Sequence, residues 1–402
     1  MPHRHLPHYI SDEQALSRLC DALESCTRLG IDTEFIGEDS FVPRLELIQL
    51  STTDLQVVLD FPALQQCEAL PRLCEILCST KIEKIVHAGR QDLELLATYV
   101  GQLPRPFFDT QIAASMLGFG AQIAYAQLVQ RTQGAKLEKS HTFTNWSQRP
   151  LSHEQIAYAL ADVRYLLPIH DELLRRLQSL GRLEWVQEEF DRLGTLVVER
   201  EQTSRERYQR IRGWDSLKPR QAAVLRELTA WRETEARRRN VPRGRVLRDE
   251  VLLQVARQAP KHQAELREIR GFPPQEVARS SEAILAIIAH ALTLPASEWP
   301  EVPRDRKPDP ESAGQIELLQ AALKARAAAL GIAPTLLATA GDLQKIVEER
   351  ATGATPTVPL LEGWRRAIAG DMILSVLEGR TALRISSESG QVMIYRDEDR
   401  SA

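Results

Sequence analysis

The sequence predicts a mixed α/β domain followed by two all-α helical domains. Three observations predict this class. Short apolar runs alternate with helical stretches in the first half, helical periodicity alone continues from Leu217, and five prolines crowd into the sixteen residues from Pro295 to Pro310. The expected division is residues 1–205 for the α/β domain, 210–292 and 313–385 for the helical domains, 293–312 for a proline-rich linker and 386–402 for a polar tail.

The α/β domain is predicted from short runs of alternating type. Strand-like runs occur at residues 29–35, 45–50, 55–59, 84–87 and 107–108, and helical stretches occur at 64–78, 91–99, 110–117 and onward to about residue 200. The first three strands follow one another so closely that they favour an antiparallel start to a mixed sheet. Neither a G-x-G-x-x-G nor a G-x-x-x-x-G-K-[ST] motif occurs, which argues against a dinucleotide-binding domain and a P-loop.

The helical domains are predicted from apolar spacing. Leu217, Val224, Leu225, Leu228 and Trp231 fall on one helical face, and further helices are expected to about residue 291. A second helical block is expected from about residue 315 to 377, with breaks at 331–334 and 352–359.

Composition is typical of a globular protein, with 43% hydrophobic and 26% charged residues across 402 positions. No apolar run has the roughly 18–20 residues that a membrane span needs, and the first residues are too polar for a signal peptide. All five cysteines lie between Cys20 and Cys78, an odd count that favours reduced thiols and a cytoplasmic protein. Cys74 and Cys78 have helical spacing without a second pair, so buried thiols are favoured over a zinc site.

Charge is unevenly distributed. The net charge is -4, yet residues 205–270 hold 18 lysines and arginines against 9 acids. A basic module within an acidic chain is expected when one domain binds a polyanion and another uses carboxylates.

Two acids stand close together in an apolar strand. Asp32 and Glu34 are two positions apart, so both side chains point to the same face of the predicted strand. Such a pair calls for a compensating cation, and Mg²⁺ and Mn²⁺ prefer hard carboxylate oxygens. For an isolated D-x-E, a solvated strand end is the more common explanation.

Two further signals are weak when taken singly. Tyr158 and Asp162 are four residues apart and share a helical face, although a surface pair would look the same. Asp92 falls in the first turn of a predicted helix, where acids are favoured for capping and by the helix dipole. His87 ends the preceding strand and could be an ordinary histidine with internal hydrogen bonds.

In their order and spacing, these residues resemble the DEDD superfamily of 3′→5′ exonucleases. Asp32-Thr-Glu34 matches its first motif, Asp92 ends its second, and Tyr158 with Asp162 matches the third motif of the tyrosine subclass. His87-Ala-Gly-Arg-Gln-Asp92 is similar to the bacterial ribonuclease D branch, whereas proofreading exonucleases commonly have Asn and an aromatic residue there. The likeness covers roughly residues 10–200 and implies a ribonuclease H-like fold.

The helical block from about Lys218 resembles an HRDC domain, the module shared by helicases and ribonuclease D. The likeness lies in the segments 217–221, 225–232, 240–243 and 265–271. Residues 313–382 would match the second, degenerate HRDC-like unit of the family. This assignment rests on helical periodicity alone.

The resemblance implies phosphodiester hydrolysis with two divalent metal ions, Mg²⁺ or Mn²⁺, held by Asp32, Glu34, Asp92 and Asp162. Tyr158 would orient the attacking water. An unperturbed phenol, with a pKa near 10, is a poor base at neutral pH. The implied partner is RNA, with tRNA precursors as the family's usual substrate, and no membrane or obligate protein partner is expected.

Nucleic-acid contacts are predicted for one histidine and five arginines: His87, Arg237, Arg238, Arg239, Arg243 and Arg245. The arginines could equally form a solvated helix end. Trp214 and Trp231 could stack on bases, although core packing is favoured for Trp231.

Two alternatives to an exoribonuclease stay open. One is a DNA 3′→5′ exonuclease, because sequence motifs do not report recognition of the 2′-hydroxyl. The other is a non-catalytic RNA-binding adaptor, against which the intact set of four acids and a tyrosine argues.

Overall fold

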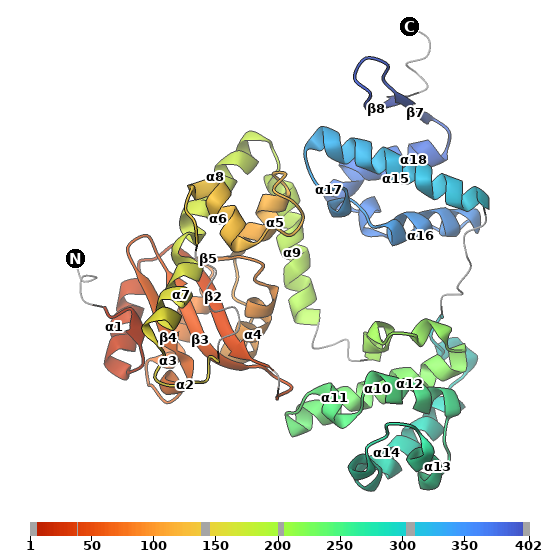
Figure 1. Cartoon of the computed structure of the whole chain (residues 1–402), viewed down its shortest axis with the longest axis horizontal. Helices are drawn as coiled ribbons and strands as arrows, with labels where there is room; N and C mark the ends of the chain where they lie inside the picture. Colours follow the sequence, from red (N-terminus) through yellow and green to blue (C-terminus); the bar gives the residue numbers. More distant parts are fainter. Residues whose placement is uncertain (1–5, 38, 138–144, 200–204, 303–309, 397–402) are drawn as a thin grey trace. The chain divides into compact units, whose positions relative to one another are not determined.

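The computed structural model describes residues 6–37, 39–137, 145–199, 205–302 and 310–396 (Figure 1). Contacts divide the chain into two compact units. The first comprises Met1–Thr33, Leu47–Gly194 and Lys307–Ala402, and the second comprises Glu34–Glu46 and Thr195–Arg306. The sequence predicts a separate helical domain at 313–385 after a linker at 293–312. The contacts group these helices with the α/β residues, so the separate domain stays a prediction.

A six-stranded mixed sheet with the strand order β1-β4-β3-β2-β5-β6 lies in the first unit, except for the parts of β2 and β3 within Glu34–Glu46. The strands are β1 (Tyr9–Ile10), β2 (Arg28–Ile36), β3 (Arg44–Ser51), β4 (Gln56–Asp60), β5 (Glu83–Val86) and β6 (Phe107–Asp109). Strands β3 and β4 are antiparallel, whereas β2–β5 and β5–β6 are parallel. The mixed α/β class and the antiparallel pairing near its start are therefore confirmed.

Nine helices described in the first 200 residues accompany this sheet: α1 (Glu13–Leu23), α2 (Phe61–Leu64), α3 (Leu70–Cys78), α4 (Arg90–Val100), α5 (Thr110–Ser115), α6 (Tyr125–Gln133), α7 (His153–Arg164), α8 (Leu166–Ser179) and α9 (Leu183–Glu199). Strand β3 is buried at every position after Arg44, as expected for a central strand that is covered on both faces.

Three details of the predicted elements are wrong. The helix expected at 64–78 is interrupted between α2 and α3, and β1 was not predicted. The helical stretch expected up to about residue 200 is broken after α6, where Gly134 takes a left-handed conformation with φ 68°. Described residues 134–137 and 145–152 are not helical.

The C-terminal residues add four α-helices and a hairpin. These are α15 (Pro310–Leu330), α16 (Ala340–Ala351), α17 (Gly363–Arg365), α18 (Asp371–Leu377), β7 (Thr381–Ile385) and β8 (Val392–Arg396). Because β8 pairs antiparallel with β7, the polar tail predicted from residue 386 is wrong up to Arg396. Residues 386–391 form the turn, and the hydrophobic run at 392–395 that follows it was the sequence signal for the second strand.

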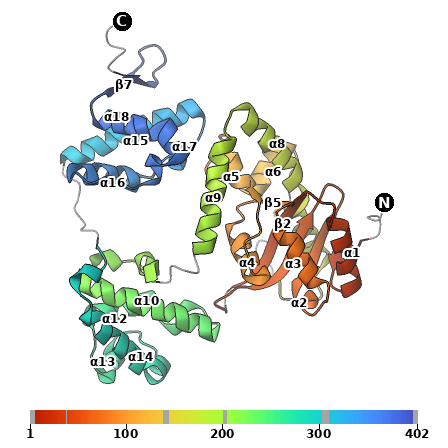
Figure 2. The same ribbon diagram turned by 180° about the vertical axis from the view of Figure 1, so that it is seen from behind.

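Apart from Glu34–Glu46, the second unit is helical and has its own core (Figure 2). Its helices are α10 (Pro219–Arg239), α11 (Arg243–Val246), α12 (Asp249–Gln258), α13 (Gln263–Glu268) and α14 (Pro274–Thr293), preceded by a 3₁₀-helix at Arg205–Arg210. The predicted apolar face of α10 is buried in this core. Trp214 and Trp231 also pack against it, which favours a structural role for both over base stacking.

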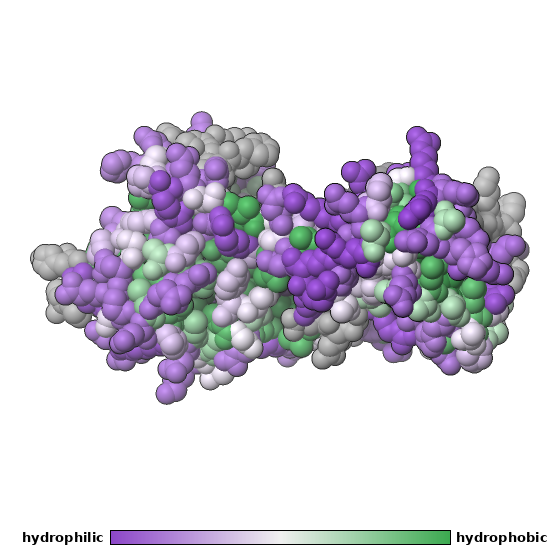
Figure 3. All heavy atoms as spheres, turned by 90° about the horizontal axis from the view of Figure 1, so that it is seen from below, coloured by the Kyte–Doolittle hydropathy of each residue, from purple (hydrophilic) through white to green (hydrophobic). Residues whose placement is uncertain are grey.

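The surface in Figure 3 is mainly hydrophilic, with hydrophobic side chains scattered between charged ones. No helix within the described residues is long and apolar enough to cross a membrane.

Candidate metal centre

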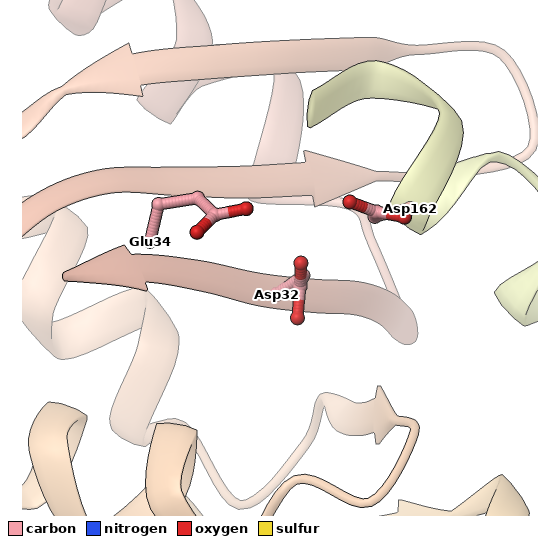
Figure 4. Close-up of side chains that lie close together, drawn as sticks. All are labelled: Asp32, Glu34 and Asp162. Atoms are coloured by element: carbon pink, nitrogen blue, oxygen red, sulfur yellow. The ribbon is translucent and has the colours of Figure 1, made fainter. Parts of the chain in front are cut away.

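Strand β2 and helix α7 bring three carboxylates together (Figure 4). Asp32 and Glu34 share one face of β2, because Thr33 between them points to the opposite face. Asp162 comes from the last turn of α7. One carboxylate oxygen of each residue lies within 4.8 Å of those of the other two, and all three side chains are half-buried.

The position of α7 follows from its ends and its apolar face. Ser152 caps the helix in a reciprocal capping box with Gln155, which determines where the helix begins. Ala159 and Leu160 then pack with Leu47 of β3. These contacts hold the helical face that carries Tyr158 and Asp162 in a defined position relative to the sheet.

Gly30 permits a close approach of α8, the helix directly after α7, to β2. A Cβ atom at this position would lie 2.2 Å from Ser51 Oγ and 3.3 Å from Leu166 Cβ. Ser51 Oγ also donates a 2.8 Å hydrogen bond to the carbonyl oxygen of Val163, next to Asp162. A side chain at position 30 would therefore displace the segment that carries Asp162.

The electrostatics of the cluster fit a divalent cation. Burial raises the pKa of Asp162 to about 7, against a partial lowering by the hydrogen bond from the Tyr158 hydroxyl. A carboxylate that is costly to ionise beside two others is stabilised by a cation. Three carboxylate oxygens at this separation are also a suitable donor set for Mg²⁺ or Mn²⁺.

Asp92, the fourth predicted metal ligand, is not part of this cluster. Its carboxylate accepts a hydrogen bond from Thr33 Oγ1, on the opposite face of β2 from Asp32. Burial raises the pKa of Asp92, and the Thr33 hydroxyl partly offsets that rise. The structure thus brings three of the four predicted acids together and connects the fourth to the same strand through Thr33, which the sequence did not mark as functional.

The turn before Asp92 is organised by Asp109, another residue that motif reasoning did not single out. Its carboxylate accepts hydrogen bonds from the backbone N–H groups of Ala88 at 3.1 Å and Gly89 at 2.9 Å. It also caps α5. A side chain at Gly89 would meet Val86 at 2.5 Å. The available signal was an acid between a predicted strand and a predicted helix, the position that favours a helix cap.

His87 has a structural role in place of the predicted contact with nucleic acid. One ring nitrogen is 2.9 Å from Thr110 Oγ1 and the other is 3.1 Å from the carbonyl oxygen of Ile123. Its ring centroid lies 5.4 Å from that of Tyr125. Burial lowers the pKa of His87 to about 4, so the ring is neutral at physiological pH. A neutral ring with both nitrogens engaged is poorly suited to bind phosphate.

The five arginines predicted to contact nucleic acid differ in their surroundings. Arg239 is 11% exposed and pairs with Glu235 and Glu276, so it has an internal role instead of the predicted contact. Arg238 is exposed and pairs with Glu235, and Arg245 is exposed and pairs with Asp39. Arg243 bonds to Glu233, and it and Arg237 lie over the ring of Phe41, at 4.5 and 5.5 Å from its centroid.

Comparisons with known proteins agree on both parts of the chain. A family profile described as a 3′-5′ exonuclease matches residues 7–178, and an HRDC domain profile matches residues 221–288. The chain is 38% identical to ribonuclease D of Acidiphilium cryptum, with 94% of each chain covered, and 36% identical to that of Granulibacter bethesdensis, with 95% of each covered.

Among solved structures, the chain is similar to Escherichia coli RNase D, described as an exoribonuclease involved in structured RNA processing. The TM-score is 0.80 at 29% identity, covering 92% of this chain and 98% of the other.

Proposed function

This chain belongs to the ribonuclease D family of 3′→5′ exoribonucleases, and we propose that it trims the 3′ ends of tRNA precursors by hydrolysis with two divalent metal ions. The observation that carries this proposal is the cluster of Asp32, Glu34 and Asp162. We place the activity in the cytoplasm, where the free cysteines of the described chain would stay reduced.

In this proposal Asp32, Glu34 and Asp162 would hold one ion, and Asp92 would contribute to the second. Divalent ions held by these carboxylates would supply Lewis-acid activation of water and stabilisation of the developing phosphate charge. The chain itself places the carboxylate oxygens of these acids around a shared site. The rigid strand β2 and the capped helix α7 serve this purpose because neither needs to move for the acids to meet.

Tyr158 would orient the water that attacks the phosphorus. Its hydroxyl already bonds to the carboxylate of Asp162, and its ring lies 6.1 Å from that of Trp146. This packing limits the rotamers of Tyr158, so the hydroxyl is held at the edge of the carboxylate cluster. We therefore assign Tyr158 to positioning first and proton transfer second.

The helical unit would bind the remainder of the RNA. Residues 205–270 carry twice as many cationic as acidic side chains, 18 against 9, and affinity for RNA should fall as salt rises. Arg237, Arg238, Arg243 and Arg245 stay candidates for these contacts, whereas Arg239 and His87 do not.

One labelled substrate in two forms tests the function. A tRNA precursor labelled at its 5′ end should yield a ladder that shortens stepwise from the 3′ side, and the 3′-labelled form should release labelled mononucleotide at once. Both reactions should require Mg²⁺ or Mn²⁺ and stop in EDTA. The Asp162→Asn protein is the matched control, since it alters one ligand atom without changing size.

Three results would count against the proposal. An unchanged precursor would favour a binding adaptor, and internal fragments would show an endonuclease. Faster shortening of a DNA oligomer of the same sequence would favour a DNA exonuclease.

A further inference from the structure

A pocket lined by arginines opens in the second unit, within the helical module. Its volume is about 350 Å³. It lies among the 3₁₀-helix at Arg205–Arg210, α10, α11 and the start of α12. The lining side chains include five cations, Arg207, Arg210, Arg232, Arg243 and Arg248, and two acids, Asp249 and Glu250. Only Arg243 among these belongs to the set predicted from the sequence.

Arg232 carries a buried donor that has no acceptor within the described residues. The side chain is only 6% exposed, and its Nη1 donates to the Leu247 carbonyl oxygen at 2.8 Å and to Asp249 at 2.7 Å. Its Nε is buried and has no hydrogen-bond partner there. An unsatisfied buried guanidinium N–H costs roughly 1–3 kcal/mol or more, and the protein retains this cost in a side chain that lines the pocket.

Positive charge exceeds negative charge around this pocket. The Nε atoms of Arg207 and Arg243 lie 3.2 and 2.5 Å from one Glu233 oxygen, so a single carboxylate serves two guanidinium groups. With Asp249 and Glu250, three acids therefore face five arginines. Arg210 and Arg248 are exposed, and the described part of the chain offers neither side chain a hydrogen-bond or ion-pair partner.

The start of α12 adds backbone donors to the same place. The helix begins at Asp249 after Arg248, and no side chain in the described ranges caps it. The first N–H groups of an uncapped helix are unsatisfied and favour an anion. Arg248, Asp249 and Glu250, which form this end, all line the pocket.

We propose that this pocket binds a phosphate group of the RNA strand, at a site separate from the catalytic carboxylates. The guanidinium fork matches the geometry of phosphate oxygens. Among the described residues no aromatic side chain lines the pocket, so these residues offer no platform for the base of a free nucleotide. A backbone phosphate needs no such platform. This inference rests on the proposed function, because it names the part of the RNA that the helical module holds.

RNA binding by the full-length protein tests the pocket without catalysis. Anisotropy of a fluorescein-labelled single-stranded RNA is titrated in EDTA for the wild type and for the double variant Arg210→Gln/Arg248→Gln. The matched control is Arg267→Gln/Arg270→Gln, which removes two exposed arginines of the same module outside the pocket. We expect affinity to fall about tenfold in the pocket variant and less than twofold in the control.

The salt dependence provides a second readout. Loss of one phosphate contact should reduce the slope of log K against log[salt] by about 0.7 for single-stranded RNA, in the pocket variant alone. Equal losses of affinity in both double variants would show only general electrostatic attraction and overturn the proposal.

Titrations with inorganic phosphate and with 5′-AMP identify the source of the phosphate. RNA affinity that survives in the pocket variant while binding of 5′-AMP is lost would make this a nucleotide site and would also overturn the proposal.

The trimming assay separates the pocket proposal from the proposed exonuclease function. A wild type that trims RNA and a pocket variant that binds it normally would reject the pocket alone, whereas loss of binding without any trimming by the wild type would reject the exonuclease alone.

Discussion

The hydroxyl of Thr33 donates a hydrogen bond to the carboxylate of Asp92, which joins the first turn of α4 to the middle of β2. Thr33 stands between Asp32 and Glu34, so a single segment of strand carries two members of the acidic cluster on one face and holds the fourth acid on the other. The distance of Asp92 from the cluster is thus controlled by a residue that belongs to the first motif.

Thr33→Val should test this connection. Valine has the shape of threonine but lacks the donor, so Asp92 would keep its burial and lose the bond that lowers its pKa. We expect turnover to fall about tenfold, with Thr33→Ser close to the wild type because serine keeps the hydroxyl. Steady-state trimming of labelled RNA measures both variants. Wild-type turnover in Thr33→Val would show that this bond does not support catalysis.

Removal of a cluster carboxylate should have a larger effect than removal of the phenol. Asp32→Ala and Asp162→Asn should each lower turnover at least ~10³-fold, because each removes a metal ligand. Tyr158→Phe should lose most turnover but keep a measurable remainder, since it removes only a positioning hydroxyl. Circular dichroism checks that the fold is kept. Wild-type turnover by any of the three would exclude that residue from the mechanism.

Much of the site was predictable because its geometry is local. Alternation along a strand places Asp32 and Glu34 together, and helical spacing places Tyr158 beside Asp162. Neither rule states that β2 and α7 are neighbours; that followed from the family resemblance alone. The position of Asp92 outside the cluster depends on tertiary packing, so no local rule could predict it.

The errors in the fold have a similar cause. Strand β1 has two residues, too few for any periodicity, and is stabilised by its pairing with β4. Strand β8 follows a turn of six polar or glycine residues, and its hydrophobic run of four residues, 392–395, is too short for periodicity to distinguish a strand from an isolated apolar stretch in a polar tail. Arg239 looked like part of a basic patch because its partner Glu276 lies 37 residues away in α14.

Metal binding should stabilise the folded protein. A cation that binds the folded but not the unfolded chain contributes RT ln(1 + [M]/Kd), about 2.7 kcal/mol at a hundredfold excess over Kd. We expect Mn²⁺ to raise the melting temperature by several degrees relative to EDTA. In Asp162→Asn the response should be largely lost, while its melting temperature in EDTA should equal or exceed that of the wild type, because two like charges no longer face a third. An equal response to Mn²⁺ in both proteins would place the ion elsewhere.

Gln49 offers a test of packing beneath the site. It is fully buried in β3, on the face that carries Leu47 and Ser51, and neither amide atom has a hydrogen-bond partner in the part of the chain that the structure describes. Gln49→Leu has a similar volume and no polar atoms, so the free energy of unfolding should rise by about 1 kcal/mol. Urea unfolding measures the change. A loss of stability would instead show that the amide has a partner, such as a buried water.

The neutral state of His87 should make stability depend on pH. Its pKa is about 4 in the folded protein, against about 6.5 for an unperturbed histidine. Between these values the unfolded chain binds a proton that the folded chain does not, so stability falls as the pH is lowered from 6.5 toward 4. At pH 5 this contribution is about 2 kcal/mol relative to pH 7.5.

Urea unfolding of the wild type and of His87→Gln at both pH values isolates the contribution of His87, because all other titrating groups are shared. The variant should be less stable at pH 7.5, since it loses the bonds to Thr110 and Ile123, but its loss on acidification should be smaller by about 2 kcal/mol. Equal losses in the two proteins would show that His87 is protonated in the folded state at pH 5, and that its internal hydrogen bonds do not require the neutral ring.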